Sequence, residues 1–412
     1  MLLLFAVATA CKKSFTTSLS GSATNYLAVD GTIISGDSTF ITLSRTTAIN
    51  DTNQLKSELK AAVSVEDDKG TLFNLKEQGK GIYFLPVTNF DMSRTYRLDI
   101  KTKDGKIYQS DFVPVKKSPP IDSVYYHAND ELNVQFFVDT HDPTNNTRYY
   151  RWDYKEVWRY VSFYRASFIY SNGQIVNISG NPGFPDNSGY YCYRHDYSNQ
   201  VFIGSSANQS QDIIKKQLLA SLPDTSEKIS EVYAIIVSQY ALTAEGLKYY
   251  QALKSNTEQL GSIFDPQPSF VKGNIHCVTS PTDRVMGFVS ASTVTSKMIM
   301  FKYSDLGAFK IGLLTNQYPV DINSNGQFYY GAPNAAGCPE TTLLFEPAST
   351  FDVRAAQTLG SGKNLLVDQY FVAPTPLNTP PWQGYFVAPR NCVDCTLKGG
   401  TSTRPSYFPV PF

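Results

Sequence analysis

Alternation of apolar and polar residues dominates the first part of the chain and predicts short β-strands. It is visible in LAVDGTII, AAVSVED and TYRLDIKTKDGKIYQS, which are separated by glycine-containing turns. Asp104 and Gly105 give the clearest hairpin signal, because Asp-Gly between two alternating runs favours a tight β-turn. This spacing predicts an immunoglobulin-like or transthyretin-like β-sandwich over residues 25–115, which ends at the stiff segment KKSPP.

A larger β-rich domain is predicted over residues 121–412. The aromatic residues of YYRWDYKEVW, at 149–158, recur with the period of two that is typical of a strand. Residues 171–200 are rich in Gly, Pro and Asn and predict a long loop. In QDIIKKQLLASL, at 211–222, Ile and Leu follow one helical face, and Ser210 is the expected helix cap.

The stretch from 231 to 293 has the most regular pattern in the chain. Residues 232–242 are almost entirely apolar, which predicts a central strand covered on both faces. Thr243 is expected to cap a helix over 243–260, and a strand is expected to restart at 273–278. The residues that recur on one face of this helix are Leu247, Tyr250, Leu253, Thr257 and Leu260. The predicted fold is therefore mainly β, with two or so packed helices, near 211–222 and 243–260.

The loop inside this stretch carries Phe264 and Phe270, with Pro266 and Pro268 between them. Proline prevents either neighbouring element from continuing through the loop. Two interpretations of the rings stay open: they complete the core, or they contact a partner.

Composition narrows the function classes. The chain of 412 residues predicts two or three domains, and its formal net charge of +0 argues against a nucleic-acid-binding protein. Aromatic residues make up 13% and charged residues 17% of the chain, which suits sheet-rich extracytoplasmic proteins.

The N-terminal sequence MLLLFAVATAC resembles a lipoprotein signal. The resemblance implies a signal peptide at 1–10 and acylation of Cys11, and the Ser/Thr-rich residues that follow predict a flexible tether over 11–24. Each buried methylene of an acyl chain contributes about 0.8 kcal/mol to membrane binding. No other segment has the roughly 18 uninterrupted apolar residues of a membrane helix, so we expect anchoring without a membrane span.

Motifs for catalysis are absent from the sequence, including G-x-S-x-G, H-E-x-x-H and the Walker loop. We therefore expect no enzyme activity, no catalytic residue and no cofactor. The pair Cys392 and Cys395 has the spacing of a zinc ligand pair, but the chain has no second pair of this kind. In an oxidising compartment disulfides are favoured, with Cys338, Cys392 and Cys395 as candidates, and spacing leaves their pairing open.

Several stretches together resemble the Bacteroidota lipoprotein family known as domain of unknown function 4249. They are LAVDGTII, TYRLDIKTKDGKIYQS, YYRWDYKEVW, YAIIVSQYALTAEGLKYYQALKSNTEQLGSIFDPQPSFVKGNIHCV and CVDCTLKGGTSTRPSYF. The resemblance implies an outer-membrane lipoprotein encoded beside a TonB-dependent receptor. Because KKSF after Cys11 lacks acidic residues, the periplasmic and the cell-surface face both stay open.

The function expected from these features is that of a non-catalytic, lipid-anchored outer-membrane protein that partners a TonB-dependent receptor in nutrient uptake. The alternative is a carbohydrate- or peptide-binding surface adhesin module, because exposed Tyr and Trp rings can stack on sugars. A hydrolase would require His195 and Asp196 to converge in a cleft.

Overall fold

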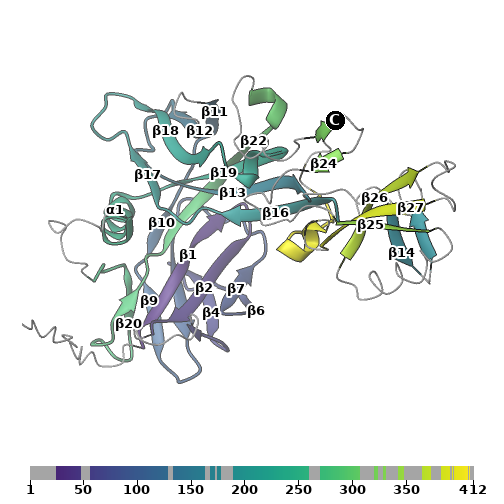
Figure 1. Ribbon diagram of the computed structural model, residues 1–412. Helices are drawn as coiled ribbons and strands as arrows, with labels where there is room; N and C mark the ends of the chain where they lie inside the picture. Colours follow the sequence, from purple (N-terminus) through teal and green to yellow (C-terminus); the bar gives the residue numbers. More distant parts are fainter. Residues whose placement is uncertain are drawn as a thin grey trace, which may run out of the picture. The chain divides into compact units, whose positions relative to one another are not determined.

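The computed structural model describes residues 25–47, 56–128, 133–162, 168–171, 174–177, 189–258, 270–306, 320–322, 328–330, 342–347, 364–372, 382–389, 392, 394–406 and 408. The described residues are mainly β, with one α-helix (Figure 1). They divide into two compact units. The first unit falls within 1–115 and 270–291, and the second within 116–269 and 292–412.

The first unit consists of short antiparallel strands. One set joins β6, β7, β2 and β1 in that order, with β3 also on β2. A second set joins β5, β4, β8, β9 and β20, and β10 also pairs with β8. The strands are β1 Leu27–Ser35, β2 Thr39–Arg45, β3 Lys56–Ser57, β4 Ala62–Asp67, β5 Leu72–Asn74, β6 Lys76–Gly79, β7 Ile82–Leu85, β8 Thr95–Lys101, β9 Ile107–Ser110, β10 Val113–Lys116, β20 Ile275–Cys277 and β21 Val285–Met286.

Alternate residues of both strand sets are buried in one hydrophobic cluster. Leu43 and Ile41 contribute from β2, and Leu98 and Ile100 contribute from β8. All four side chains are fully buried. The alternating pattern that predicted strands in this region is therefore the pattern that forms the core, and the strand prediction for this region is confirmed.

The second unit is built on two sheets that have described side chains. One sheet has the order β11, β12, β18, and in the other β13 pairs with β16, β17 and β19, while β22 lies on β19. Their bounds are β11 Ile121–Ala128, β12 Asn133–Asp142, β13 Tyr149–Val161, β16 Tyr191–Tyr197, β17 Phe202–Ser205, β18 Asp212–Pro223, β19 Val232–Ala241 and β22 Ser290–Lys302.

Further strands of the chain form two smaller sheets. β15, β14, β26, β27 and β25 pair in that order, and β23 pairs with β24. The strands are β14 Phe168–Ser171, β15 Gln174–Asn177, β23 Val320–Ile322, β24 Phe328–Tyr330, β25 Thr342–Pro347, β26 Asn364–Val372 and β27 Trp382–Pro389, and the short 3-10 helices are η1 Glu227–Ile229, η2 Tyr303–Leu306 and η3 Cys395–Lys398.

Strand β19 is central, as the apolar run predicted, because β13 and β22 pair along its two edges. Its first residues are buried on both faces: Tyr233 and Ile235 belong to the main core, while Val232 and Ala234 pack with Phe408. From Ile236 onward, alternate residues are half-buried. Coverage of both faces therefore holds for the first half of the strand.

Helix α1 spans Ala244–Glu258 and confirms the helix predicted at 243–260. The hydroxyl of Thr243 accepts a hydrogen bond from the amide of Gly246 at 3.1 Å, as an N-cap residue does. Leu247 and Tyr250 are buried, whereas Thr257 is exposed. The buried stripe is therefore shorter than the periodicity predicted.

The polar turn after β12 is organised by one buried carboxylate. Asp142 accepts hydrogen bonds from the amides of Thr144, Asn146 and Thr147, at 2.9, 3.1 and 2.9 Å, and from the Thr144 hydroxyl at 2.7 Å. Burial acts to raise the pKa of Asp142, but these hydrogen bonds outweigh it and lower the pKa to about 2. The turn therefore depends on an ionised Asp142.

The helix predicted at 211–222 is wrong, because these residues form strand β18. β18 pairs with β12, and the register shifts twice, between Phe136 and Phe137 and between Val138 and Thr140. Lys216, near the second shift, has a φ of 55°. Each bulge moves the alternation by one residue, so the buried Ile214 and Leu219 do not keep a period of two.

Two further expectations are corrected. Residues 270–291, expected in the second domain, cluster with the first unit, where β20 pairs with β9 and β21 runs parallel to β1. The loop predicted at 171–200 contains β15 and β16. β16, β20 and β21 are each defined by a partner strand that is distant in sequence, which a local pattern does not show, whereas β15 forms a hairpin with β14.

Candidate functional site

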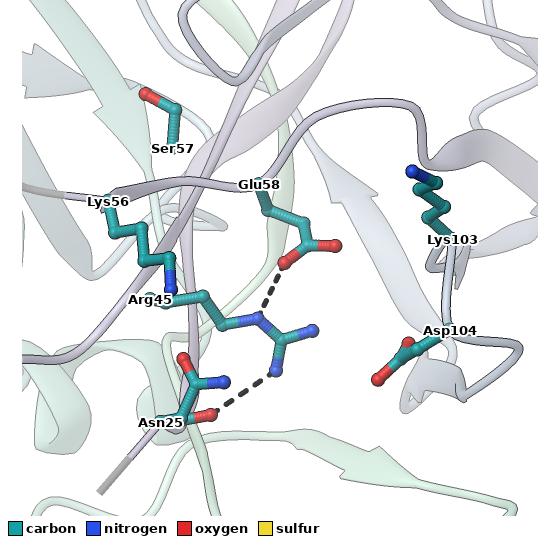
Figure 2. Close-up of a pocket in the computed structure, with 7 residues that line it drawn as sticks. All are labelled: Asn25, Arg45, Lys56, Ser57, Glu58, Lys103 and Asp104. Atoms are coloured by element: carbon teal, nitrogen blue, oxygen red, sulfur yellow. Dashed lines mark hydrogen bonds and ion pairs between the residues drawn. The ribbon is translucent and has the colours of Figure 1, made fainter. Parts of the chain in front are cut away.

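A polar hollow of about 370 Å³ opens on the first unit (Figure 2). Arg45 comes from the end of β2, Lys56 and Ser57 form β3, and Asp104 lies in the turn between β8 and β9. Folding thus brings together charged residues that are far apart in the sequence. The lining residues are Asn25, Arg45, Lys56, Ser57, Glu58, Lys103 and Asp104.

Arg45 is fixed at the base of the hollow. Its Nε donates to the Glu58 carboxylate at 2.6 Å, and one terminal nitrogen lies 3.3 Å from the carbonyl of Asn25 and 3.4 Å from the hydroxyl of Tyr108. The Arg45 and Glu58 side chains are 8% and 14% exposed, so water screens this ion pair weakly. Burial opposes the charge of Arg45, yet its hydrogen bonds to Glu58 and Tyr108 outweigh burial and raise its pKa.

Asp104 lies on the opposite side of the hollow, in the hairpin that Asp104-Gly105 predicted. Gly105 has a φ of 87°, a left-handed conformation that glycine adopts without strain. The hydroxyl of Thr102 donates to Asp104 and lowers the pKa of its carboxyl, and the charge of Arg45 contributes in the same direction. Asp104 is therefore ionised at neutral pH. The charge of Arg45 stabilises the ionised carboxylate across the hollow, without a direct ion pair between the two side chains.

The hollow can hold a polar ligand. Lys56 and Lys103 are exposed, and neither ammonium group forms a hydrogen bond or an ion pair with another residue that the structure describes. Cationic and anionic groups thus line one small space, which suits a charged or zwitterionic small molecule.

A second candidate surface crosses the large sheet of the second unit. Tyr197 of β16, Lys155 of β13, Ile236 of β19 and Met298 of β22 are successive cross-strand partners. Paired residues in adjacent strands share one face of a sheet, so these four form a row, here named the Tyr197 row. Tyr197 is 61% and Met298 40% exposed, and the Lys155 ammonium lies 5.6 Å from the centre of the Tyr197 ring.

Next to the Tyr197 row, the same face is covered by the C-terminal segment. Phe408 is 1% exposed and packs with Val157, Tyr193, Val232 and Ala234. The amides of Tyr193 and Thr401 each donate to the other residue's carbonyl, at 2.8 and 3.0 Å. The Tyr197 row therefore lies beside the part of the sheet that Phe408 covers.

A disulfide between Cys192 and Cys395 fixes this segment to β16. Cys192 was not among the candidates from the sequence, because the two residues are separated by 203 positions. Cys392 is also disulfide-bonded, and Cys338 lies outside the described residues. The two cysteines of CVDC therefore belong to two different disulfides. Cys277 is free and buried.

Phe270 lies in the first unit with 40% of its surface exposed. The guanidinium of Arg284 is 5.4 Å from its ring centre. Phe264 and Cys11 lie outside the described residues.

The structure does not bring His195 and Asp196 to a common site. His195 packs against the ring of Tyr197 at 5.8 Å, whereas Asp196, on the other face of β16, lies 3.5 Å from the ammonium of Lys228. Lys228 also contacts the buried carboxylate of Glu156. Among the residues with a described placement, no group of His, Cys, Asp and Glu is arranged to hold a metal, and no helix is long and apolar enough to cross a membrane.

Sequence reasoning missed the hollow and the Tyr197 row. The turn at Asp104-Gly105 was visible, but nothing local connects it to Arg45 or to Lys56. The row follows from strand pairing between residues as distant as Lys155 and Met298. Both surfaces arise from long-range contacts.

A family described as Domain of unknown function (DUF4249) matches residues 12–298. No curated protein matches the chain. Among solved structures, a segment of two fibronectin type-III domains from chicken tenascin is similar at 11% identity over 53% of this chain and 92% of that chain, with a TM-score of 0.17. A pullulanase from Anoxybacillus sp. LM18-11, complexed with maltotriose, is similar at 11% identity over 52% of this chain and 24% of that chain, with a TM-score of 0.14.

Proposed function

The chain belongs to the DUF4249 family, and on that premise we propose that it is a non-catalytic accessory lipoprotein of the outer membrane that partners a TonB-dependent receptor in nutrient uptake. The observation that carries the proposal is the apolar segment that ends at Cys11. Acylation of Cys11 places the two β-rich units at the membrane surface.

The first unit supplies a rigid module next to the proposed anchor. Its two strand sets share one hydrophobic cluster, which supports the finer proposal of an immunoglobulin-like or transthyretin-like sandwich. A module of this kind is already folded when it presents its loops and strand faces to a partner.

The Tyr197 row is the surface that we assign to the receptor. It combines the exposed Tyr197 ring and Met298 side chain with the Lys155 cation and the half-buried Ile236, on a sheet in which β13 and β19 are each paired along both edges. Aromatic and Met side chains are enriched in protein interfaces, and a rigid sheet loses little entropy when it binds.

Site-specific photocrosslinking in native membranes tests this assignment. A photoreactive amino acid at Tyr197 or Met298 should capture an outer-membrane receptor. The same group at Leu218, which is 41% exposed on β18, is the control. Equal capture from all three positions, or capture from none, would contradict the assignment.

Membrane attachment is tested separately with Cys11→Ala. We expect the native chain to fractionate with the outer membrane and the variant to be released in soluble form. Retention of Cys11→Ala in the membrane would refute lipid anchoring.

The alternative, a carbohydrate- or peptide-binding adhesin, is supported by the exposed ring of Tyr197, since stacking on sugars needs an open aromatic face. Trp152 and Trp158 do not provide one, because they are 1% and 6% exposed. Binding of the purified chain to a glycan array, lost on Tyr197→Ala and without receptor capture, would favour the alternative.

A further inference from the structure

Five charged side chains, three cationic and two anionic, line the hollow of the first unit. Figure 2 shows Arg45, Glu58, Lys103 and Asp104 around the open space, with Lys56 beside Arg45. Arg45 and Glu58 are fixed at the base, Lys103 and Asp104 come from the β8–β9 turn, and Lys56 comes from β3. The mixture of signs is a property of the folded chain, since the residues come from separate segments.

The base of the hollow is rigid. Nε and one terminal nitrogen of Arg45 are engaged by Glu58, Asn25 and Tyr108. Figure 2 shows the other terminal nitrogen pointing into the hollow. Arg45 therefore offers one oriented donor without having to rearrange on binding, which lowers the entropic cost of an interaction.

The rim carries charges that are available to a ligand. Lys103 and Asp104 are both exposed, and within the described part of the chain neither forms an ion pair. Asp104 is held by its hydrogen bond from Thr102, so its carboxylate keeps a fixed position. Lys56 adds a second exposed ammonium to the lining of the hollow.

We propose that this hollow binds a small zwitterion, in which a short linker joins a primary ammonium group to a phosphate or a carboxylate. The anionic group is bound by Arg45 and the neighbouring lysines, and the ammonium group by Asp104 and Glu58. A simple anion would leave the two carboxylates without a ligand group of opposite charge, and a simple cation would leave Arg45 and the two lysines without one. The presence of both signs in one lining thus favours a molecule that carries both charges.

A lipid headgroup and a soluble metabolite share this chemistry. The headgroup source rests on the proposed function, in which acylated Cys11 anchors the chain 14 residues before Asn25. The soluble source does not depend on acylation, so the two parts of the proposal can fail independently.

The binding test uses isothermal titration calorimetry with the full chain and O-phosphoethanolamine, with ethanolamine and inorganic phosphate as half-ligands. We expect O-phosphoethanolamine to bind at least about tenfold more tightly than either half-ligand. Lys103→Gln and Asp104→Asn should each weaken binding about fivefold to tenfold, as loss of a charge-assisted contact does. Lys76→Gln, an exposed lysine of the same unit that does not line the hollow, should bind like the native chain.

Vesicle sedimentation identifies the source. The full chain with Cys11→Ser is mixed with phosphatidylcholine vesicles, with and without phosphatidylethanolamine. Binding that requires phosphatidylethanolamine and is lost on Asp104→Asn assigns the headgroup, whereas calorimetric binding without vesicle binding assigns a soluble ligand. Equal affinity for O-phosphoethanolamine and its half-ligands, or unchanged affinity in both rim variants, would overturn the proposal whether or not Cys11 is acylated.

Discussion

Replacing Asp142 by Asn should destabilise the second unit by about 2 kcal/mol. In Asp142→Asn one side-chain oxygen becomes an NH₂ group, which cannot accept hydrogen bonds, so the amides on that side lose their acceptor. Those amides belong either to Thr144 or to Asn146 and Thr147. A buried donor without an acceptor costs about 1–3 kcal/mol. The asparagine also lacks the negative charge that strengthens the hydrogen bonds.

The depressed pKa gives a second route to the magnitude. The pKa of Asp142 falls from an ordinary 3.8 to about 2, and each pKa unit corresponds to about 1.4 kcal/mol. Both estimates therefore give a destabilisation of about 2–3 kcal/mol for Asp142→Asn. Because the folded pKa is the lower one, this contribution is present above pH 4 and is lost as the pH falls through about 2.

Urea unfolding followed by tryptophan fluorescence measures the effect. The chain has 3 Trp residues, and all of them follow residue 115, so the signal reports on the second unit. The difference between the native chain and Asp142→Asn should be constant from pH 7 to pH 5 and should shrink between about pH 4 and pH 2. Asp224→Asn, in the turn after β18, is the control and should change stability by less than about 0.5 kcal/mol. A difference below about 0.5 kcal/mol at pH 7, or one that persists unchanged at pH 2, would refute the reasoning.

Three other changes test the described contacts. Glu156 is 2% exposed, and Lys228→Met removes the cation that its carboxylate contacts. We expect the free energy of unfolding to fall by about 3 kcal/mol in the same fluorescence assay. A change below about 1 kcal/mol would show that Glu156 needs no cation. Thr243→Ala removes the α1 cap and should cost about 1 kcal/mol, with faster hydrogen exchange confined to the first turn of the helix; unchanged exchange there would contradict the capping role. The double variant Cys192→Ala and Cys395→Ala lacks the disulfide that closes a loop of 203 residues, and its free energy of unfolding should fall by up to about 5 kcal/mol. In limited proteolysis we expect cleavage near Thr401 to occur earlier than cleavage within β16. Resistance equal to that of the native chain would show that the disulfide does not hold the segment.

The sequence predicted the elements whose pattern is local. Strand β19 and helix α1 were found because each is marked by its own residues: β19 by a continuous apolar run, and α1 by the Thr243 cap and the apolar stripe that follows it. β18 was misread because bulges interrupt its alternation, and residues 270–291 were misplaced because their partners, β1 and β9, are far away in the chain.

The candidate surfaces depended even more on distant contacts. Asp104 was visible as a turn residue, but its approach to Arg45 depends on how β2 and the β8–β9 hairpin meet. Cys395 was among the disulfide candidates, while its partner, Cys192, was not identifiable from spacing. The sequence thus predicted the local role of single residues such as Asp104 and Cys395. It did not predict which distant residues each of them would contact.

Affinity purification of the intact, lipidated chain from native membranes is the most direct test of the proposed function. We expect a TonB-dependent receptor to co-elute in stoichiometric amount with the native chain and to be lost from a chain that carries Tyr197→Ala and Met298→Ala. Elution of the native chain without a receptor, under conditions that keep other outer-membrane complexes intact, would contradict the account.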